Sequence, residues 1–469
     1  MKTNKGWDEI QAKIAAGEAA VLTAGEFKLL AREADAEELC RRVDAVTVAT
    51  FAPMCSSGVF INFGHGSPPI RMEELSLDGV PAYGGVAAVD AYLGATAERP
   101  GDPGFGGAHV IETLVRGGEV RLEARGKGTD CYPGRSVSAR VRLADLNEAW
   151  FDNPRNAYQN YGAGTNGSDR ALRTYLGVLE PRYGTVSYAT SGELSPLLND
   201  PQARFIGAGT AAWVGGAVGM VTGCGTQFDT EVPVNGKGLP VRGSRTLALR
   251  ADLKAADPRF VAAAAVPGYG VSLFLGVAFC LPVPDAEAAH ALSVRDEDIT
   301  VQVRDYGAAG RPVVLETSYA ELRSGSVEIA GVRSRSACSS SLAKARELAR
   351  ELRDLVRAGR FPVRPPVEAL PARASPRPLA AATSLSAPAS AASPPEGVVD
   401  PSRTGPAGYA RRLCVDCGAC VSHCPARALS LEGEGPHLAY DASACAGCGT
   451  CAGVCPRGAF RSEPEARHG

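Results

Sequence analysis

The C-terminal part of the chain carries two copies of one cysteine pattern. Each copy has the spacing C-x2-C-x2-C-x3-C and is followed at once by proline. Three thiolates in one tight loop can ligate three irons of a cubane, while the fourth cysteine of each copy ligates the other cluster. The pattern therefore predicts two [4Fe–4S] clusters that pass electrons one at a time. Their expected ligands are Cys414, Cys417, Cys420 and Cys455 for one cluster, and Cys445, Cys448, Cys451 and Cys424 for the other.

Two other uses of these cysteines fit the pattern less well. Structural zinc sites take four ligands, usually as pairs, and do not combine three neighbouring cysteines with a crossed fourth. A disulfide framework would indicate a secreted protein. The N-terminus is polar and lacks the apolar segment of a signal peptide. Because iron–sulfur clusters also need reducing conditions, we expect a cytoplasmic protein.

Six further cysteines lie before this region. Most cysteines of this kind are small buried hydrophobes. We expect Cys40, Cys224 and Cys280 to be buried in this way, because they lie in helical, apolar or Gly-rich segments. The role of Cys338, which precedes a serine run, stays open. Cys55 and Cys131 fall in polar turns, where Ser-Ser-Gly after Cys55 offers donors that would stabilise a thiolate and the aspartate before Cys131 would disfavour one.

Two histidines of the Gly-rich N-terminal half are candidates for acid–base chemistry. His65 lies in a predicted loop, and His109 lies at the start of a predicted helix. A histidine titrates near neutral pH, so either could move protons in a reaction. The alternative, a histidine that merely hydrogen-bonds to its neighbours, is at least as common.

The elements around these residues follow from hydrophobic periodicity and from helix stop signals. A strand over 43–50 leads into the Cys55 loop and gives it a rigid base. The uncharged segment 260–284 is long enough to cross a membrane, but an internal Pro-Gly-Tyr-Gly favours two buried strands around a turn. The glycine-rich segment 207–219 lacks a phosphate-loop lysine, which favours tight packing. Helices are expected over 7–16, 26–32, 36–43, 108–115 and 340–359, and strands over 120–124 and 136–143.

Composition suggests how these segments are grouped. The formal net charge of −2 gives no electrostatic reason to expect nucleic acid or a membrane surface as a partner. Residues 362–408 are rich in Pro, Ala and Ser and have no apolar period, which predicts a disordered linker. We therefore expect a mixed α/β catalytic domain over 1–361, this linker, and a small α+β ferredoxin-like domain over 409–469 with two hairpins. The linker would let that domain dock and undock.

Several N-terminal segments closely resemble the homocysteine-biosynthesis family, whose members are L-aspartate semialdehyde sulfurtransferases. They are FAPMCSSGVFINFGH (51–65), VPAYGG (80–85), AVDAYLGA (88–95), GAHVIE (107–112), GTDCYP (128–133) and NPRNAYQN (153–160). The resemblance covers most of residues 5–360. It implies that Cys55 and Cys131 are the two functional cysteines, and that a ferredoxin is the partner. Members can also carry a pair of CBS domains after the catalytic domain, and here only the linker follows.

The resemblance implies synthesis of homocysteine from aspartate semialdehyde and sulfide. Exchange of the aldehyde oxygen for sulfur gives a thioaldehyde, and reduction to the thiol needs two electrons and two protons. The fused clusters, fed by a low-potential electron donor, would supply them. Cys55 would carry sulfur as a persulfide or capture the aldehyde, with Cys131 as a second thiol. Arg155, Asn153 and Asn156 are candidates for binding the substrate carboxylate. The alternatives are a carrier of electrons or persulfide, and a reductase of another carbonyl compound.

Overall fold

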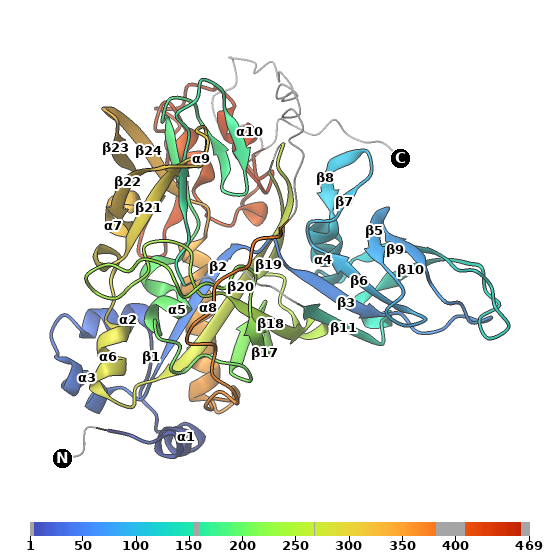
Figure 1. Ribbon diagram of the computed structural model, residues 1–469, viewed down its shortest axis with the longest axis horizontal. Helices are drawn as coiled ribbons and strands as arrows, with labels where there is room; N and C mark the ends of the chain where they lie inside the picture. Colours follow the sequence, from blue (N-terminus) through green and yellow to red (C-terminus); the bar gives the residue numbers. More distant parts are fainter. Residues whose placement is uncertain (1–3, 153–158, 267, 381–408, 461–469) are drawn as a thin grey trace.

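The computed structural model describes residues 4–152, 159–266, 268–380 and 409–460. A long mixed sheet runs through the catalytic domain, and its strands pair in the order β1-β2-β20-β16-β17-β18-β11-β3-β6-β5-β4-β9-β10, with β19 paired to β20 (Figure 1). The strands are β1 (Val21–Thr23), β2 (Ala45–Pro53), β20 (Gly270–Pro282), β16 (Ala211–Val214), β17 (Ala217–Cys224), β18 (Leu247–Asp252), β11 (Glu148–Asp152), β3 (Gly58–Asn62), β6 (Asp90–Gly94), β5 (Val80–Tyr83), β4 (Glu74–Leu77), β9 (Glu119–Arg125), β10 (Ser136–Arg142) and β19 (Val261–Val266).

A second sheet of six strands stands beside the first and has its own apolar core. Its order is β22 (Val313–Ser318), β21 (Thr300–Asp305), β12 (Ala163–Thr165), β15 (Thr185–Tyr188), β24 (Val332–Cys338) and β23 (Ser326–Ile329). Two short hairpins are the remaining described strands of the catalytic domain: β7 (Glu98–Arg99) with β8 (Asp102–Gly106), and β13 (Leu172–Thr174) with β14 (Gly177–Leu179).

The helices appear where the apolar periodicity places them. α1 (Trp7–Ala16) ends at Gly17, which takes the left-handed conformation at φ 72°. The long α8 (Leu342–Arg357) is capped by Ser341, whose hydroxyl accepts a hydrogen bond from Lys344 N–H. It covers β2 and β20 with its apolar face. The others are α2 (Ala24–Leu30), α3 (Ala36–Arg42), α4 (Gly107–Val115), α5 (Pro196–Asn199), α6 (Ala286–Leu292) and α7 (Tyr319–Arg323).

The uncharged segment 260–284 forms β19 and β20, two strands around a turn, as expected. Every residue of β20 is buried, since α8 packs on it and β2 and β16 flank it. Among the described residues, no helix is long and apolar enough to span a membrane. The glycine-rich segment forms the β16–β17 hairpin, in which a Cβ on Gly219 would lie 2.3 Å from the Arg250 carbonyl oxygen. Tight packing therefore explains the glycine there.

The first part of the predicted linker is packed, contrary to the expectation of disorder. Val363 and Leu370 are buried in the main core, and Val367 N–H donates to the Ala208 carbonyl at 2.8 Å. Thr230 N–H likewise donates to the Ala374 carbonyl at 2.8 Å. The first part of the Pro-rich segment is therefore packed against the catalytic domain. The remainder of the expected linker, 381–408, lies outside the described residues.

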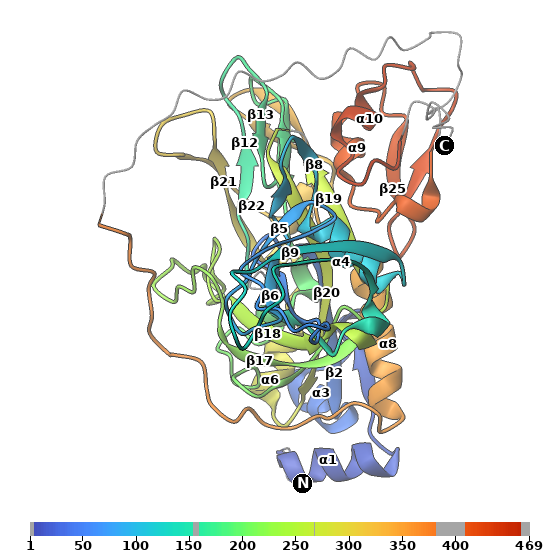
Figure 2. The ribbon, with the colours of Figure 1, turned by 90° about the vertical axis from the view of Figure 1, so that its right-hand side faces the viewer.

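The ferredoxin-like domain lies against the catalytic domain, beside β19 of the first sheet and β24 of the second (Figure 2). It contains α9 (Ala419–His423), α10 (Thr450–Val454) and a hairpin of β25 (Leu429–Glu432) and β26 (His437–Tyr440). In the described part of this domain, the expected second hairpin is reduced to one bridge between Tyr409 and Phe460.

Candidate active site and iron–sulfur centre

Cys55 lies in a tight turn between β2 and β3. Met54 N–H donates to the Leu273 carbonyl at 2.6 Å and ties the turn to β20. The chain enters β3 at Gly58, where only glycine fits, because a Cβ there would lie 2.2 Å from the hydroxyl of Tyr92. The Cys55 thiol is therefore half-buried on a backbone that is fixed at both ends.

Two hydroxyl groups of the β19–β20 hairpin face the Cys55 sulfur. Ser272 Oγ lies 3.1 Å from Sγ, and the Tyr269 hydroxyl donates to Sγ at 4.0 Å. The ring of Tyr269 is 6.4 Å from that of Tyr175, whose hydroxyl in turn lies 2.6 Å from the hydroxyl of Tyr306. The local sequence points instead to the serines that follow Cys55 as the source of stabilising hydroxyl groups. The described partner is a serine more than two hundred residues away, which no local pattern could reveal.

Two successive backbone hydrogen bonds link the Cys55 turn to the start of α4, which carries His109. The Ser57 carbonyl accepts from Ala95 N–H, and the Ala95 carbonyl accepts from Ala108 N–H at 2.9 Å. His109 Nδ1 accepts from Gly106 N–H at 3.2 Å, and the imidazole stacks on Phe105 at 5.0 Å. Burial lowers the pKa of His109 and outweighs the nearby Glu112 carboxylate, which acts to raise it, while the Arg457 guanidinium lowers it further. The imidazole is therefore neutral at physiological pH.

Cys131 and His65 lie together at a different place. Cys131 is exposed in the loop between β9 and β10, at the far right of Figure 1. The neighbouring Tyr132 stacks on the exposed His65, with ring centroids 5.7 Å apart. His65 follows the end of β3, whereas Cys55 precedes its start. The five residues of β3 place about 13 Å of strand between the two positions. Within one chain, Cys55 is thus separated from Cys131 and His65.

The other cysteines differ in burial. Cys40 and Cys280 are buried as expected, and burial raises the pKa of Cys280 to about 12. Cys224 is exposed on β17, contrary to expectation, because alternate residues of that strand face solvent. Cys338 is buried at the end of β24, where its thiol donates to the Thr190 carbonyl at 3.2 Å. Residues 153–158, which include Arg155, Asn153 and Asn156, lie outside the described residues.

The eight C-terminal cysteines surround two small cavities. Cys414, Cys417, Cys420 and Cys455 line one, and Cys424, Cys445, Cys448 and Cys451 line the other. This is the crossed grouping that the spacing predicts. Among the described residues, no set of three or more His, Cys, Asp or Glu side chains would hold a single metal ion.

Backbone N–H groups point at several of these sulfurs. Asp416 N–H donates to Cys414 Sγ at 3.4 Å, and Ala459 N–H donates to Cys455 Sγ at 3.3 Å. Around the second cavity, Ala428 N–H donates to Cys424 Sγ at 3.2 Å and Gly447 N–H to Cys445 Sγ at 3.4 Å. Such donors stabilise cluster thiolates and tune the potential of the cluster. The residues present therefore fit [4Fe–4S] clusters.

An apolar contact joins the first cysteine group to the Cys55 strand pair. Val415 and Cys417 pack in one cluster with Phe51 of β2 and Phe274 of β20, whose rings stack at 5.7 Å. Phe274 is two residues from Ser272, so both side chains lie on the same face of β20. The first cysteine group and the Cys55 sulfur therefore contact neighbouring positions of one strand.

A buried ion pair reinforces this docking. Both Arg457 Nη atoms donate to the Glu112 carboxylate at 2.8 Å, and these side chains are only 6% and 12% exposed. Burial acts to raise the pKa of Glu112, but the hydrogen bonds and charge of Arg457, together with hydrogen bonds from Ala263 N–H and Arg116, hold that pKa below its usual value. Arg457 also donates to the Ala263 carbonyl, and Ala265 N–H donates to the Pro456 carbonyl at 2.9 Å.

Comparison with known proteins identifies the families of both domains. The family described as homocysteine biosynthesis enzyme, sulfur-incorporation, matches residues 19–363, and the 4Fe-4S dicluster domain family matches residues 413–459. An L-aspartate semialdehyde sulfurtransferase of Methanosarcina acetivorans is 44% identical over 370 residues, which cover 78% of this chain and 72% of that protein. A protein of the same name from Methanocaldococcus jannaschii is 46% identical over 340 residues, covering 70% of this chain and 64% of the relative.

Two more distant archaeal proteins without an assigned function are 28% and 26% identical. No solved structure matches this chain. The catalytic-domain match spans well over half of the chain, and the C-terminal match falls on the eight clustered cysteines. The chain therefore belongs to the homocysteine biosynthesis family of sulfur-incorporating enzymes, and it carries a 4Fe-4S dicluster domain at its C-terminus.

Proposed function

We propose that this protein converts L-aspartate semialdehyde and sulfide to L-homocysteine, with electrons from its own C-terminal domain. The names of the two relatives support the substrate. The observation that carries the reductive part is the docking of Val415 and Cys417 against Phe51 and Phe274, next to the Cys55 turn. When bound, two [4Fe–4S] clusters supply electrons one at a time.

The reaction balances as two steps. The aldehyde and hydrogen sulfide give a thioaldehyde and water, so the C=O bond is replaced by C=S. The thioaldehyde then takes up two electrons and two protons and becomes the thiol. A low-potential donor must provide the electrons, because no side chain of the protein can do so over repeated turnovers.

The residues around Cys55 suit the sulfur-handling role. The half-buried Cys55 thiol would add to the aldehyde carbon while the carbonyl oxygen takes up a proton. Sulfide would then replace the hydroxyl with release of water, and departure of the Cys55 thiol would leave the thioaldehyde. Ser272 Oγ, 3.1 Å away, would donate to the sulfur and stabilise its anion. Tyr269 and the neutral His109 are candidates for proton transfer. Arg173 packs across the β19–β20 turn, since its Cδ lies 2.2 Å from where a Cβ of Gly268 would stand. It is our candidate for binding the substrate carboxylate.

Purified holoprotein, mixed anaerobically with aspartate semialdehyde, sulfide and a low-potential reductant, should form homocysteine. Cys55→Ala should abolish the product and leave the cluster absorbance unchanged, and Cys280→Ala serves as the control for a buried thiol. Homocysteine formation by Cys55→Ala would remove Cys55 from the mechanism. No product from the wild type, with persulfide or electrons still transferred, would indicate a carrier instead.

A further inference from the structure

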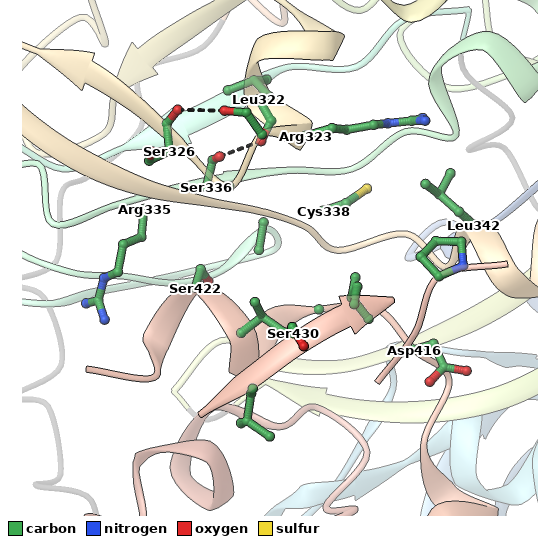
Figure 3. Close-up of a pocket in the computed structure, with 18 of the residues that line it drawn as sticks. Leu322, Arg323, Ser326, Arg335, Ser336, Cys338, Leu342, Asp416, Ser422 and Ser430 are labelled. Carbon is green, nitrogen blue, oxygen red and sulfur yellow. Dashed lines mark hydrogen bonds between the residues drawn. The ribbon is translucent and has the colours of Figure 1, made fainter. Parts of the chain in front are cut away.

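A cavity of about 640 Å³ lies between the catalytic domain and the ferredoxin-like domain. Figure 3 shows Arg335, Ser336 and Cys338 of β24 along one side and Ser422 and Ser430 of the ferredoxin-like domain along the other. The end of α7 and the start of α8 complete the catalytic-domain wall. None of these groups belongs to the Cys55 turn.

The lining of this cavity is strongly basic. Five arginines line it, and only Arg323 has a described ion pair, with Asp296. Among the described residues, no carboxylate lies within ion-pair distance of the other four, which are Arg333, Arg335, Arg346 and Arg427. Of the two acidic groups in the lining, Asp416 is already bound by Arg411 and Glu434 is exposed. The cavity thus has an excess of positive charge, because four of its five arginines form no ion pair among the described residues.

The N-terminus of α8 adds neutral donors to the same wall. Ser340 stands just before the helix, is 2% exposed, and its Oγ has no hydrogen-bond partner among the described residues. Leu342, the first residue of this 16-residue helix, also lines the cavity. Helix N-termini favour anions because their first N–H groups lack partners within the helix. Arg346 follows one turn later, and burial lowers its pKa.

We propose that this interdomain cavity binds a small phosphate-bearing molecule. Guanidinium forks, a serine hydroxyl and a helix N-terminus are the donors that hold phosphate in proteins. Arg346 and Ser340 would contact the phosphate oxygens from the catalytic domain, and Arg335 would close the site from β24. The volume is within the range of small-molecule sites, so a nucleotide as well as inorganic phosphate has room to enter.

Such a ligand would also favour the docked arrangement. The lining comes from both domains, with Arg346 on one and Arg427 on the other. A molecule that contacts both binds the docked form more tightly and stabilises it by linkage. This inference concerns binding and docking only, and it does not depend on the reaction proposed for Cys55.

Isothermal titration calorimetry of the holoprotein would test the proposal, with inorganic phosphate, ADP, ATP and citrate as separate probes. At least one phosphate-bearing probe should bind, and citrate should bind more weakly. Preference for ADP or ATP over phosphate would assign the site to a nucleotide, and equal binding would assign it to the phosphate group alone. No binding of any phosphate probe, or tighter binding of citrate, would overturn the proposal.

Two variants assign the binding to this cavity. Arg335→Gln/Arg346→Gln should weaken phosphate binding by about tenfold or more for each guanidinium lost, because charge-assisted hydrogen bonds disappear. Arg350→Gln, one turn further along α8 on its exposed face, is the matched control and should bind as the wild type does. Unligated melting temperatures verify that both variants fold. Wild-type affinity in the double variant would refute the site, as would equal losses in both variants.

Discussion

Replacing Glu112 by glutamine should weaken the docking of the ferredoxin-like domain without altering that domain itself. Glu112 lies on α4 of the catalytic domain, so Glu112→Gln leaves every cysteine and its hydrogen bonds in place. The variant keeps an amide oxygen for Arg457 but removes the negative charge. Arg457, which is 6% exposed, would then be a buried cation without its ion-pair partner.

The magnitude follows from the geometry. Loss of one partner of a buried, hydrogen-bonded ion pair costs about 2–5 kcal/mol. Both Glu112 carboxylate oxygens accept N–H donors, so the amide nitrogen of the variant must face one of them. The lower half of that range applies because the side chain is 12% exposed, which lets water relieve this contact. A cost of about 2–3 kcal/mol lowers the docking constant by about 30- to 150-fold.

Hydrogen exchange offers a local assay, because Ala265 N–H donates across the interface to the Pro456 carbonyl. This amide should exchange faster in Glu112→Gln by a factor approaching the change in the docking constant. Reoxidation of the prereduced clusters by aspartate semialdehyde and sulfide should slow in parallel. Glu123→Gln, which removes an exposed carboxylate of β9, should change neither quantity. Unchanged exchange at Ala265 in Glu112→Gln would refute the assignment of this ion pair to docking.

Three further outcomes test the surroundings of Cys55. Ser272→Ala should slow alkylation of Cys55 by iodoacetamide by about tenfold, because the thiolate loses a hydrogen bond, and Ser76→Ala should not. Arg173→Gln should raise KM for aspartate semialdehyde more than it lowers kcat, and an unchanged KM would exclude Arg173 from carboxylate binding. Because burial lowers the pKa of His109 below 6.5, the unfolded chain binds its proton first, and stability should fall as the pH drops below about 6.5. His109→Gln should remove that part of the pH dependence of the melting temperature.

Local sequence patterns predicted those parts of the molecule that local interactions determine. The periodicity of α8 and its serine cap gave its bounds to within two residues, and the Pro-Gly interruption predicted the β19–β20 hairpin. The cysteine spacing predicted the crossed grouping around the two cavities. In the helix and the hairpin, the signal lies within the segment that it specifies.

Long-range contacts were not predictable in this way. Glu112 and Arg457 are 345 residues apart in sequence, and Cys55 and Ser272 are 217 apart. The Pro-rich segment after residue 361 has a composition typical of a linker. Two isolated apolar side chains of this segment, those of Val363 and Leu370, are nevertheless buried in the core. Isolated apolar residues of this kind show no periodicity, so composition alone misplaced the domain boundary.

The separation of Cys131 from Cys55 leads to one more prediction. β9 and β10 stand at the end of the sheet order, and the register places their connecting loop beyond the Asn62 end of β3, away from Cys55. A thiol fixed there cannot exchange sulfur directly with Cys55 of its own chain. If both cysteines are required, Cys131 must act on another copy of the chain or through a diffusing sulfur carrier.

Mixing two inactive variants distinguishes these routes from action within one chain. Cys55→Ser and Cys131→Ser should each fail to form homocysteine alone, yet together they should recover part of the wild-type rate. A contact between copies predicts that the recovered rate rises with protein concentration and that the mixed variants associate, whereas a diffusing carrier predicts recovery across a dialysis membrane. Absence of recovery under every condition would mean that the two thiols meet within one chain, which would require the β9–β10 arm to move through the length of β3.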